Sequence, residues 1–373
     1  MTIFLTFCQQ IVYTQPNIQP NIQPIKHSQQ SQTFTTIINM SSLVNLEIKD
    51  ASKCLKIPDQ SSNKYSRGVL GIITGSNEYP GAAILSTRVA AQSNIGMVRY
   101  AGPLRAQNLV LQASPEVVAA EQLQGKVDAI TVGSGIPDAI HCNSESAQAQ
   151  RAQIANILKN YENESQSSNI QSQSQNALPP VCVDAGALDL LPKKVCAKVV
   201  LTPHAGELCS LFARYGLEIS AQEILQDPVK YARKAADFTG ATVLVKGAKT
   251  VVASPSNLNI PTYIAQYGPP WLATAGSGDV LAGILGALLA QCEKNTESSK
   301  DYALVAASAA LLHGICAVFA SRSCSGNNCT QLVQDLLQSQ HSLTLEHPIV
   351  ASDIITALPH ALSILLNIKQ YTK

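Results

Sequence analysis

Short apolar runs alternate with stretches of helical periodicity from Arg67 onward. The runs are nearly continuous in Val, Ile and Leu, a pattern typical of strands buried on both faces of a sheet. They occupy residues 69–74, 97–101, 127–132, 181–184, 199–202 and 242–245. Apolar residues at helical spacing fill 81–95 and about 145–160, 206–215 and 229–238. This alternation predicts an α/β fold with a doubly wound, mainly parallel sheet flanked by helices.

The residues that follow the predicted strands are the first place to look for chemistry. Ligands of open α/β sheets bind at the carboxyl ends of the strands. Here those ends carry Gly75-Ser76, Gly133-Ser134-Gly135, Asp184 and Lys246. Glycine permits close approach of the backbone to a ligand, and Asp184 is placed either as an active-site acid or as a turn residue that bonds its own loop.

Three segments break the rhythm. Residues 1–40 repeat Gln-Pro-Asn-Ile and predict a disordered tail, with Met40 as a candidate start of translation. Residues 162–177 and 322–341 are rich in Ser, Gln and Asn and are expected to be low-complexity inserts. The remaining 41–373 predict one domain.

Composition excludes some classes of function. The net charge of +1 gives no basis for binding nucleic acid. Ten cysteines contain no C-x-x-C pair, and several lie in apolar runs, which favours a reducing cytoplasm. No stretch of about 20 apolar residues is free of polar interruption, so no membrane-spanning helix is expected.

The segment Thr274–Asp279 (TAGSGD) is the strongest chemical signal, with an apolar helix predicted to begin at Asp279. The amides of Gly276, Ser277 and Gly278 would then point outward at a helix N-terminus, which suits an anion such as a transferring phosphoryl group. Asp279 is a candidate general base. The alternative, at about even odds on these residues alone, is that Asp279 only caps the helix.

Two further loops carry weaker signals. In Thr202–Glu207 (TPHAGE), His204 is a candidate substrate ligand, and Glu207 a candidate to hold a Mg²⁺-bound water. The alternative is a loop histidine and a glutamate that complements the helix dipole. On the residues of this loop alone, we favour that alternative. In Lys246–Thr250 (KGAKT), two lysines and backbone amides suit a nucleotide phosphate, whereas the alternative is a tight hairpin with solvated lysines.

The order of these segments is more specific than any one of them. GSNEYPGAA, VGSG, VDAGAL, TPHAGE, KGAKT and ATAGSGDVLAG together resemble the NAD(P)H-hydrate dehydratase family of the ribokinase-like superfamily. The resemblance runs from about Arg67 to Ala320 and resumes over 351–362. His204, where related vitamin-precursor kinases usually have Asn, favours the dehydratase branch. The epimerase domain often fused to this family is expected to be absent, because 1–66 are too few residues to form it.

The resemblance implies an activity. A nucleotide phosphorylates the C6 hydroxyl of hydrated NADH or NADPH, phosphate leaves, and the double bond is restored, which makes the enzyme a carbon–oxygen hydro-lyase. ADP is favoured over ATP as donor. The resemblance also implies Mg²⁺, a homotetramer and a functional link to a separate epimerase. Small residues in 280–290 and 303–310 would allow close helix packing within or between protomers.

The resemblance also implies roles for single residues. Asp279 resembles the base and also contacts the damaged cofactor, with Gly276, Ser277 and Gly278 around the phosphoryl group. Glu207 resembles the superfamily's Mg²⁺-associated glutamate. The positions that resemble the site for hydrated dinucleotide are Ala82, Gly135 and His204. Those that resemble the adenine-nucleotide site are Lys246, Gly247, Ala248, Lys249, Thr250 and Gly278.

Three other functions stay open on the sequence. A ribokinase-like kinase of a thiazole or pyrimidine alcohol would share the Asp279 base but stop at the phosphate ester. A nucleotide sensor on the same fold would bind without turnover. An NAD-dependent oxidoreductase is disfavoured, because no G-x-G-x-x-G follows the first strand.

Overall fold

The predicted apolar runs form the centre of a ten-stranded sheet in the order β1-β10-β9-β8-β7-β6-β5-β2-β3-β4. Every pairing is parallel except those of β9, which runs antiparallel to β8 and β10. The doubly wound, mainly parallel sheet is therefore confirmed. The strands are β1 (Leu43–Asn45), β2 (Val69–Ile73), β3 (Met97–Ala101), β4 (Val118–Ala120), β5 (Ala129–Val132), β6 (Val181–Val183), β7 (Val199–Leu201), β8 (Thr242–Val245), β9 (Thr250–Ala253) and β10 (Thr262–Ala265).

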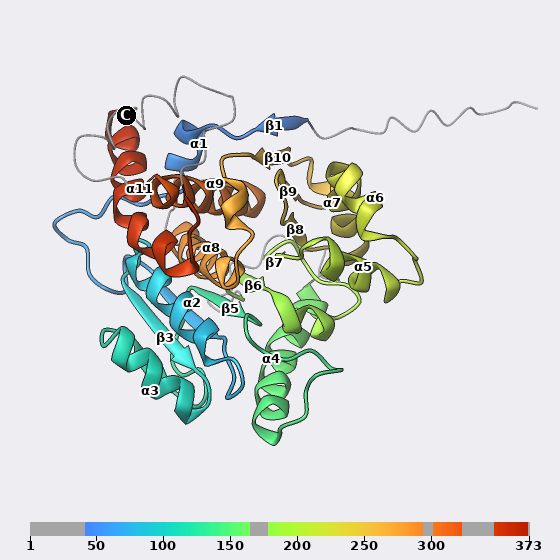
Figure 1. Ribbon diagram of the computed structural model, residues 1–373, viewed down its shortest axis with the longest axis horizontal. Coiled ribbons are helices and arrows are strands. Elements are labelled where there is room, and N and C mark those ends of the chain that lie inside the picture. The colour runs from blue at the N-terminus through green and yellow to red at the C-terminus, as the bar shows by residue number, and fades with distance from the viewer. Residues whose placement is uncertain (1–41, 165–177, 294–300, 323–346, 372–373) are drawn as a thin grey trace, which may run out of the picture. The chain divides into compact units, whose positions relative to one another are not determined.

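The computed structural model describes residues 42–164, 178–293, 301–322 and 347–371, which belong to one compact unit, Asn39–Lys373 (Figure 1). The predicted tail, most of the insert at 162–177 and nearly all of the insert at 322–341 lie outside the described residues. Within 162–177, residues 162–164 end helix α4 (Glu145–Glu164).

Helices cover both faces of the sheet (Figure 1). One face packs against α1 (Ile48–Ser52), α2 (Pro80–Gln92), α8 (Ser277–Glu293), α9 (Tyr302–Ser321) and α11 (Ala351–Tyr371). The other packs against α4, the 3₁₀ helix η1 (Ala185–Leu190), α5 (Ala205–Ala213), α6 (Ala221–Gln226) and α7 (Pro228–Thr239). Helix α3 (Leu104–Ala113) packs on α2 and β4, and η2 (Ser256–Leu258) and η3 (Pro270–Leu272) lie in loops.

Alternation along each strand divides the core in two. On β6, Cys182 faces the layer of α8 and α9, whereas Val181 and Val183 face the layer of α4 and α5. Successive side chains of a strand point to opposite faces, and all three are fully buried. A strand enclosed on both sides must be apolar at every position, and this is why these runs are continuous.

Helix α9 is buried along almost its whole length. By length and composition alone, α9 and residues 351–370 of α11 are each apolar enough to cross a membrane, contrary to the expectation from the sequence. However, 89% of the most apolar window of α9 is buried inside the protein, as in the core helix of a globular domain; the corresponding share for α11 is 44%.

The small residues of α8 and α9 serve packing inside the protomer. A methyl group on Gly283 would lie 2.5 Å from the Ser86 carbonyl oxygen of α2, and one on Gly286 would lie 2.0 Å from Thr131 Oγ1 of β5. These contacts place α8 directly against α2 and the sheet. The small residues at 280–290 therefore supply no surface to a second protomer.

Candidate active site

The carboxyl ends of the parallel strands bring the predicted loops to one edge of the sheet. Gly133-Ser134-Gly135 follows β5, Asp184 follows β6, His204 lies three residues after β7, and Lys246 follows β8. The amide of Lys246 donates to the Pro203 carbonyl oxygen at 2.9 Å. Thus the TPHAGE and KGAKT loops lie side by side, although about 40 residues separate them in the chain.

Asp184 is the centre of a buried polar network. Its side chain accepts hydrogen bonds from Ser134 Oγ and Thr202 Oγ1, both at 2.8 Å, and its Oδ1 lies 2.9 Å from Lys246 Nζ. Burial opposes ionisation, but the Lys246 ammonium and the two hydroxyls outweigh it, so the pKa of Asp184 lies below its ordinary value. Asp184 is therefore a buried, charged carboxylate rather than a turn residue bonded only to its own loop.

Lys246 is held between two carboxylates. Besides Asp184, its Nζ lies 3.5 Å from Glu207 Oε2. Burial lowers the pKa of Lys246, whereas the carboxylates of Asp184 and Glu207 raise it. Together the two carboxylates outweigh burial, so the pKa of Lys246 lies above the ordinary lysine value. The alternative interpretation was right that this loop is a hairpin, which joins β8 and β9. It was wrong about Lys246, whose side chain is only 21% exposed and is therefore not solvated.

His204 and Glu207 cap the start of α5 reciprocally. His204 Nδ1 accepts hydrogen bonds from the amides of Gly206 (3.0 Å) and Glu207 (3.3 Å), and the Glu207 carboxylate accepts from the His204 amide at 2.8 Å. An accepting Nδ1 places the proton of the neutral ring on Nε2. The His204 side chain is exposed at the edge of the sheet, and its Nε2 lies 3.6 Å from Glu207 Oε1.

Helix α8 begins at Ser277, two residues earlier than predicted. The chain enters it through Gly276 at φ +85°, where a methyl group would lie 2.5 Å from Leu85 Cδ1 of α2. The Ser277 amide was predicted to be free, but it donates to the Thr274 carbonyl oxygen at 3.3 Å. Among the described residues, the Gly276 amide, as predicted, and the Gly278 and Asp279 amides have no acceptor; the last two belong to the helix and form the open N-terminus of α8.

Asp279 lies in the first turn of α8, where its environment favours the protonated form. Burial and the negative charge of Asp184 raise the pKa of Asp279 to about 7, against the opposing effect of Lys246. A carboxyl group with this pKa exchanges a proton near neutral pH, as a general base must.

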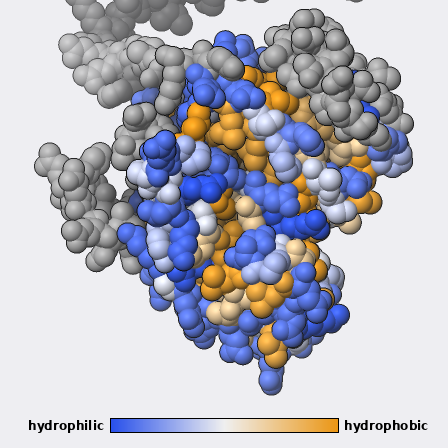
Figure 2. All heavy atoms as spheres, turned by 90° about the vertical axis from the view of Figure 1, so that its left-hand side faces the viewer, coloured by the Kyte–Doolittle hydropathy of each residue, from blue (hydrophilic) through white to orange (hydrophobic). Residues whose placement is uncertain are grey.

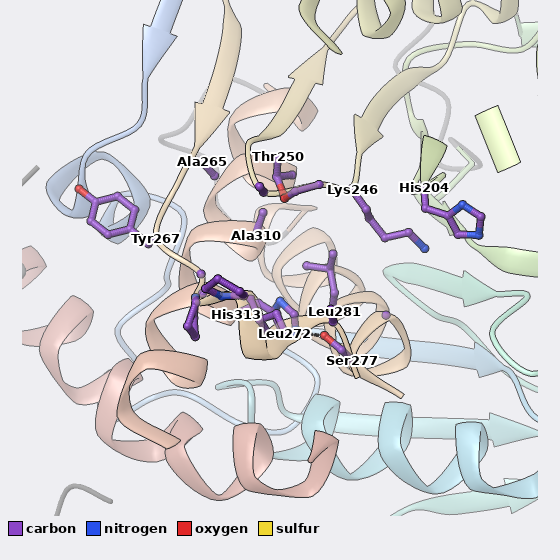
Figure 3. A pocket seen from close by; sticks show the side chains of 18 of the residues that line it. His204, Lys246, Thr250, Ala265, Tyr267, Leu272, Ser277, Leu281, Ala310 and His313 are labelled. Atoms are coloured by element: carbon purple, nitrogen blue, oxygen red, sulfur yellow. Dashed lines mark hydrogen bonds between the residues drawn. The ribbon is translucent and has the colours of Figure 1, made fainter. Parts of the chain in front are cut away.

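A pocket of about 690 Å³ opens beside the start of α8 (Figure 3). Lys246 extends toward His204 on one side, while Ser277 and His313 lie together on another. The predicted nucleotide residues line the pocket except Lys249, and His204 lines it as well. The remaining wall is mostly apolar: Ala265, Tyr267, Gly268, Pro269, Pro270, Leu272, Ala273, Leu281, Ala310 and Gly314, with Thr274.

Ala82 and Gly135 contact each other but do not line this pocket. A methyl group on Gly135, which has φ +68°, would lie 2.4 Å from Ala82 Cβ. Ala82 lies in the first turn of α2, whose Leu85 lies against Gly276. The two residues predicted to bind dinucleotide thus lie next to one another, Ala82 on the helix that packs against α8 and Gly135 in the loop after β5.

Sequence analysis missed His313, a buried residue of α9. Its Nε2 lies 3.3 Å from Ser277 Oγ, at the start of α8. Burial lowers the pKa of His313 to about 4, so the ring is neutral near pH 7. The available signal was a single histidine within an otherwise apolar helix, ALLHGICAV.

The residues at this edge do not form a cage for a metal ion. No group of three or more His, Cys, Asp or Glu side chains capable of holding one occurs among the described residues. Glu207 has one oxygen engaged by the His204 amide. The same oxygen lies 3.5 Å from Lys246 Nζ, so it already faces a cation.

Comparison with known proteins agrees with the order of these loops. The sequence model of the NAD(P)H-hydrate dehydratase family matches residues 70–338. The bifunctional NAD(P)H-hydrate repair enzyme of Mycobacterium tuberculosis is 38% identical over 256 residues, which are 66% of this chain and 46% of that enzyme. The chain thus spans about half the length of such bifunctional relatives. The ADP-dependent (S)-NAD(P)H-hydrate dehydratase of Neisseria meningitidis is 32% identical over 62% of this chain and 72% of its own.

Solved structures agree with the fold. The ADP/ATP-dependent NAD(P)H-hydrate dehydratase of Bacillus subtilis superposes with a TM-score of 0.61 at 24% identity, covering 86% of this chain and 98% of the other. A ribokinase-like superfamily protein of Enterococcus faecalis superposes with a TM-score of 0.60 at 20% identity, covering 87% and 96%.

Proposed function

This chain belongs to the NAD(P)H-hydrate dehydratase family, and from that premise we propose that it restores hydrated NADH and NADPH by nucleotide-dependent dehydration. The observation that carries the proposal is the start of α8. There Asp279, whose pKa is raised to about 7, lies beside two free amides and directly follows Gly278, which lines the pocket together with Lys246.

Each group has a role in the proposed reaction. The Asp279 carboxylate takes the proton from the C6 hydroxyl as that oxygen attacks the terminal phosphorus of the nucleotide, and the bond from that phosphorus to the rest of the nucleotide breaks. The Gly278 and Asp279 amides stabilise the charge on the transferring phosphoryl group. Phosphate then leaves with the electrons of the C6–O bond, and loss of a proton from C5 restores the double bond.

The two substrates enter from different sides of Asp279 in this proposal. The adenine nucleotide occupies the pocket, with its base against the apolar wall and its phosphates toward Gly247, Lys246 and Gly278. The hydrated dinucleotide extends toward Ala82 and Gly135, with the His204 Nε2 proton as a donor between the two. In support, α2 packs against α8 and connects these positions to Gly276.

Mg²⁺ accompanies the nucleotide in this proposal. Glu207 would hold it through a water molecule, and the ion would neutralise charge on the phosphates. The relative from Neisseria meningitidis is named as ADP-dependent, and we propose ADP, ahead of ATP, as the donor here.

The setting of the protein is also a proposal. Cys54, Cys182 and Cys316 are buried thiols, which suits a reducing cytoplasm. A homotetramer and a functional link to an NAD(P)H-hydrate epimerase follow from family resemblance alone. On the face shown in Figure 2, hydrophobic residues are interspersed with hydrophilic ones.

Incubation with chemically hydrated NADH, Mg²⁺ and ADP or ATP tests the function. We expect the absorbance of NADH to return, with release of one phosphate for each NADH formed. Accumulation of a stable phosphate ester would instead identify a small-molecule kinase, and binding of nucleotide without turnover would identify a sensor. Comparison of ADP with ATP at equal concentration tests the choice of donor.

A further inference from the structure

A single buried carboxylate connects the loops of both proposed substrate positions. Asp184 accepts from Ser134, which lies between Gly133 and Gly135, and from Thr202, two residues before His204. It also holds Lys246, the first residue of the nucleotide loop. No other described carboxylate in the pocket region has this set of contacts.

The charge of Asp184 requires an explanation beyond the hydrogen bonds. Only 2% of the residue is exposed, and burying a carboxylate is unfavourable unless it is paired. The hydroxyls of Ser134 and Thr202 would donate equally well to the neutral oxygen of an asparagine. Lys246 is the one partner whose interaction depends on the negative charge.

We propose that Asp184 is a positioning residue for the phosphoryl transfer: it holds the Lys246 ammonium beside Gly278, where the ammonium contacts the transferring group. The inference rests on the proposed function. It also assigns to Asp184 an electrostatic role toward Asp279, because the two carboxylates share the same ammonium as a neighbour.

The distances show why Lys246 needs this partner. A methyl group on Gly278 would lie 3.6 Å from Lys246 Nζ, so the ammonium approaches the first turn of α8 closely. Its contact with Asp184 is shorter than its contact with Glu207, at 2.9 Å against 3.5 Å. Without the charge of Asp184, the flexible side chain would be drawn toward Glu207 on α5 and away from Gly278.

The titratable and charged groups around Asp279 come from four elements. Asp184 after β6 raises the pKa of Asp279, and Lys246 after β8 lowers it. Glu207 on α5 lies beyond Lys246, and His313 on α9 approaches the start of α8 through Ser277. Loss of the Asp184 charge should therefore lower the pKa of Asp279. Displacement of Lys246 would oppose this change, but Asp184 has the larger effect of the two.

The test compares Asp184→Asn with Asp189→Asn. Asp189 is a matched control from the adjacent 3₁₀ helix η1, because it is also paired with a cation at 2.8 Å, but that cation is Arg151 and not Lys246. The carboxyl carbon of Asp279, assigned with Asp279→Asn, is titrated by ¹³C NMR in each nucleotide-free protein. We expect the pKa of Asp279 to be lower in Asp184→Asn than in the wild type, and to be unchanged in Asp189→Asn.

Kinetics give a second readout. We expect Asp184→Asn to lower kcat about ten- to hundredfold, as expected for a misplaced catalytic group, with a smaller effect on KM for the nucleotide, because Gly247 and Gly278 still line the pocket. An unchanged kcat, or an unchanged pKa of Asp279, would overturn the proposal. If the wild-type protein restores no NADH, the proposed function fails, but the NMR titration still decides the electrostatic role of Asp184.

A double variant removes the risk that Asp184→Asn leaves Lys246 unpaired and unfolds the protein. Asp184→Asn/Lys246→Met removes both charges together and is compared with Lys246→Met at a pH where Asp279 is ionised. Because Asp184 acts through Lys246, the double variant should lose no more kcat than Lys246→Met alone. A further loss equal to that of Asp184→Asn would show that Asp184 acts independently and would contradict the positioning role.

Discussion

At the scale of the residue, Asp279 differs from an aspartate that only caps a helix. A capping carboxylate accepts from backbone amides and has a low pKa, whereas burial and Asp184 raise the pKa of Asp279 to about 7. Asparagine caps helices as well as aspartate does. An Asp279→Asn substitution therefore separates the two interpretations, because it retains capping and removes the base.

We expect Asp279→Asn to lower kcat about 10²–10⁴-fold while the unfolding free energy and nucleotide binding change little. In the wild type, kcat/KM should fall as the pH drops below about 7, because the protonated carboxyl group cannot accept a proton. Steady-state kinetics across pH and calorimetric binding measure these effects. Near-normal turnover of the variant would restore the capping interpretation.

His313 predicts a dependence of stability on pH. Its pKa is about 4 in the folded protein against an ordinary 6.5, because burial disfavours the charged ring. Between these values the unfolded chain binds a proton that the folded chain does not, so stability decreases as the pH falls from 6.5 toward 4. The full effect is up to about 3 kcal/mol.

Urea denaturation of the wild type and His313→Gln across this window tests the prediction. The decrease should be smaller in His313→Gln by about the same amount. His360→Gln, which changes an exposed histidine of α11, is the control and should follow the wild type. Parallel curves for the wild type and His313→Gln would show that another group causes the acid sensitivity.

At the scale of the element, the pairing of α2 with α8 positions the two halves of the site. Helix α2 carries Ala82 at its start, and α8 carries Asp279 at its own. Gly283 allows the close approach, since a methyl group there would lie 2.4 Å from Val89 Cγ1 and 2.5 Å from the Ser86 carbonyl oxygen. The contact with a backbone oxygen cannot be relieved by a side-chain rotation.

Gly283→Ala should lower the free energy of unfolding by about 1–3 kcal/mol through overpacking. It should also lower activity, because separation of the helices moves Asp279 relative to Ala82. The matched control is Gly81→Ala on α2, where a methyl group meets nothing within 4 Å, and no loss of stability is expected there. Equal stability of the two variants would show that the α2–α8 contact adjusts without cost.

At the scale of the whole molecule, the sheet begins soon after the predicted tail. β1 pairs with β10 over Leu43–Asn45, and Leu46 is 3% exposed. A chain that begins at Met40 therefore retains every strand, whereas one that begins at Glu47 loses β1 and Leu46.

We expect the chain from Met40 to match the full chain in melting temperature and turnover. The chain from Glu47 should melt several degrees lower, because it loses the β1–β10 hydrogen bonds and a buried leucine, about 2 kcal/mol or more. Circular dichroism melts of the three chains measure this. A lower melting temperature for the chain from Met40 would show that residues 1–39 stabilise the domain.

The sequence alone predicted the central strands and the loops that follow them. Strands buried on both faces have a local signal, since each position must be apolar, and parallel strands necessarily end at one edge of a sheet. Met97–Ala101 and Thr242–Val245 were predicted to the residue. The strands β1, β4 and β10 escaped prediction. β1 and β4 lie at the two edges of the sheet and are partly exposed, so they lack the continuous apolar run of a strand buried on both faces.

Only the tertiary structure decided how the loops combine. Asp184 and Lys246 are 62 residues apart, and Ser277 and His313 are 36 apart. Whether Asp184 bonds its own loop or a distant lysine depends on the order of β6, β7 and β8 in the sheet. Local periodicity of the sequence carries no information about that order. The burial that raises the pKa of Asp279 and shields Lys246 likewise arises only when α8, β6 and β8 meet at the same edge.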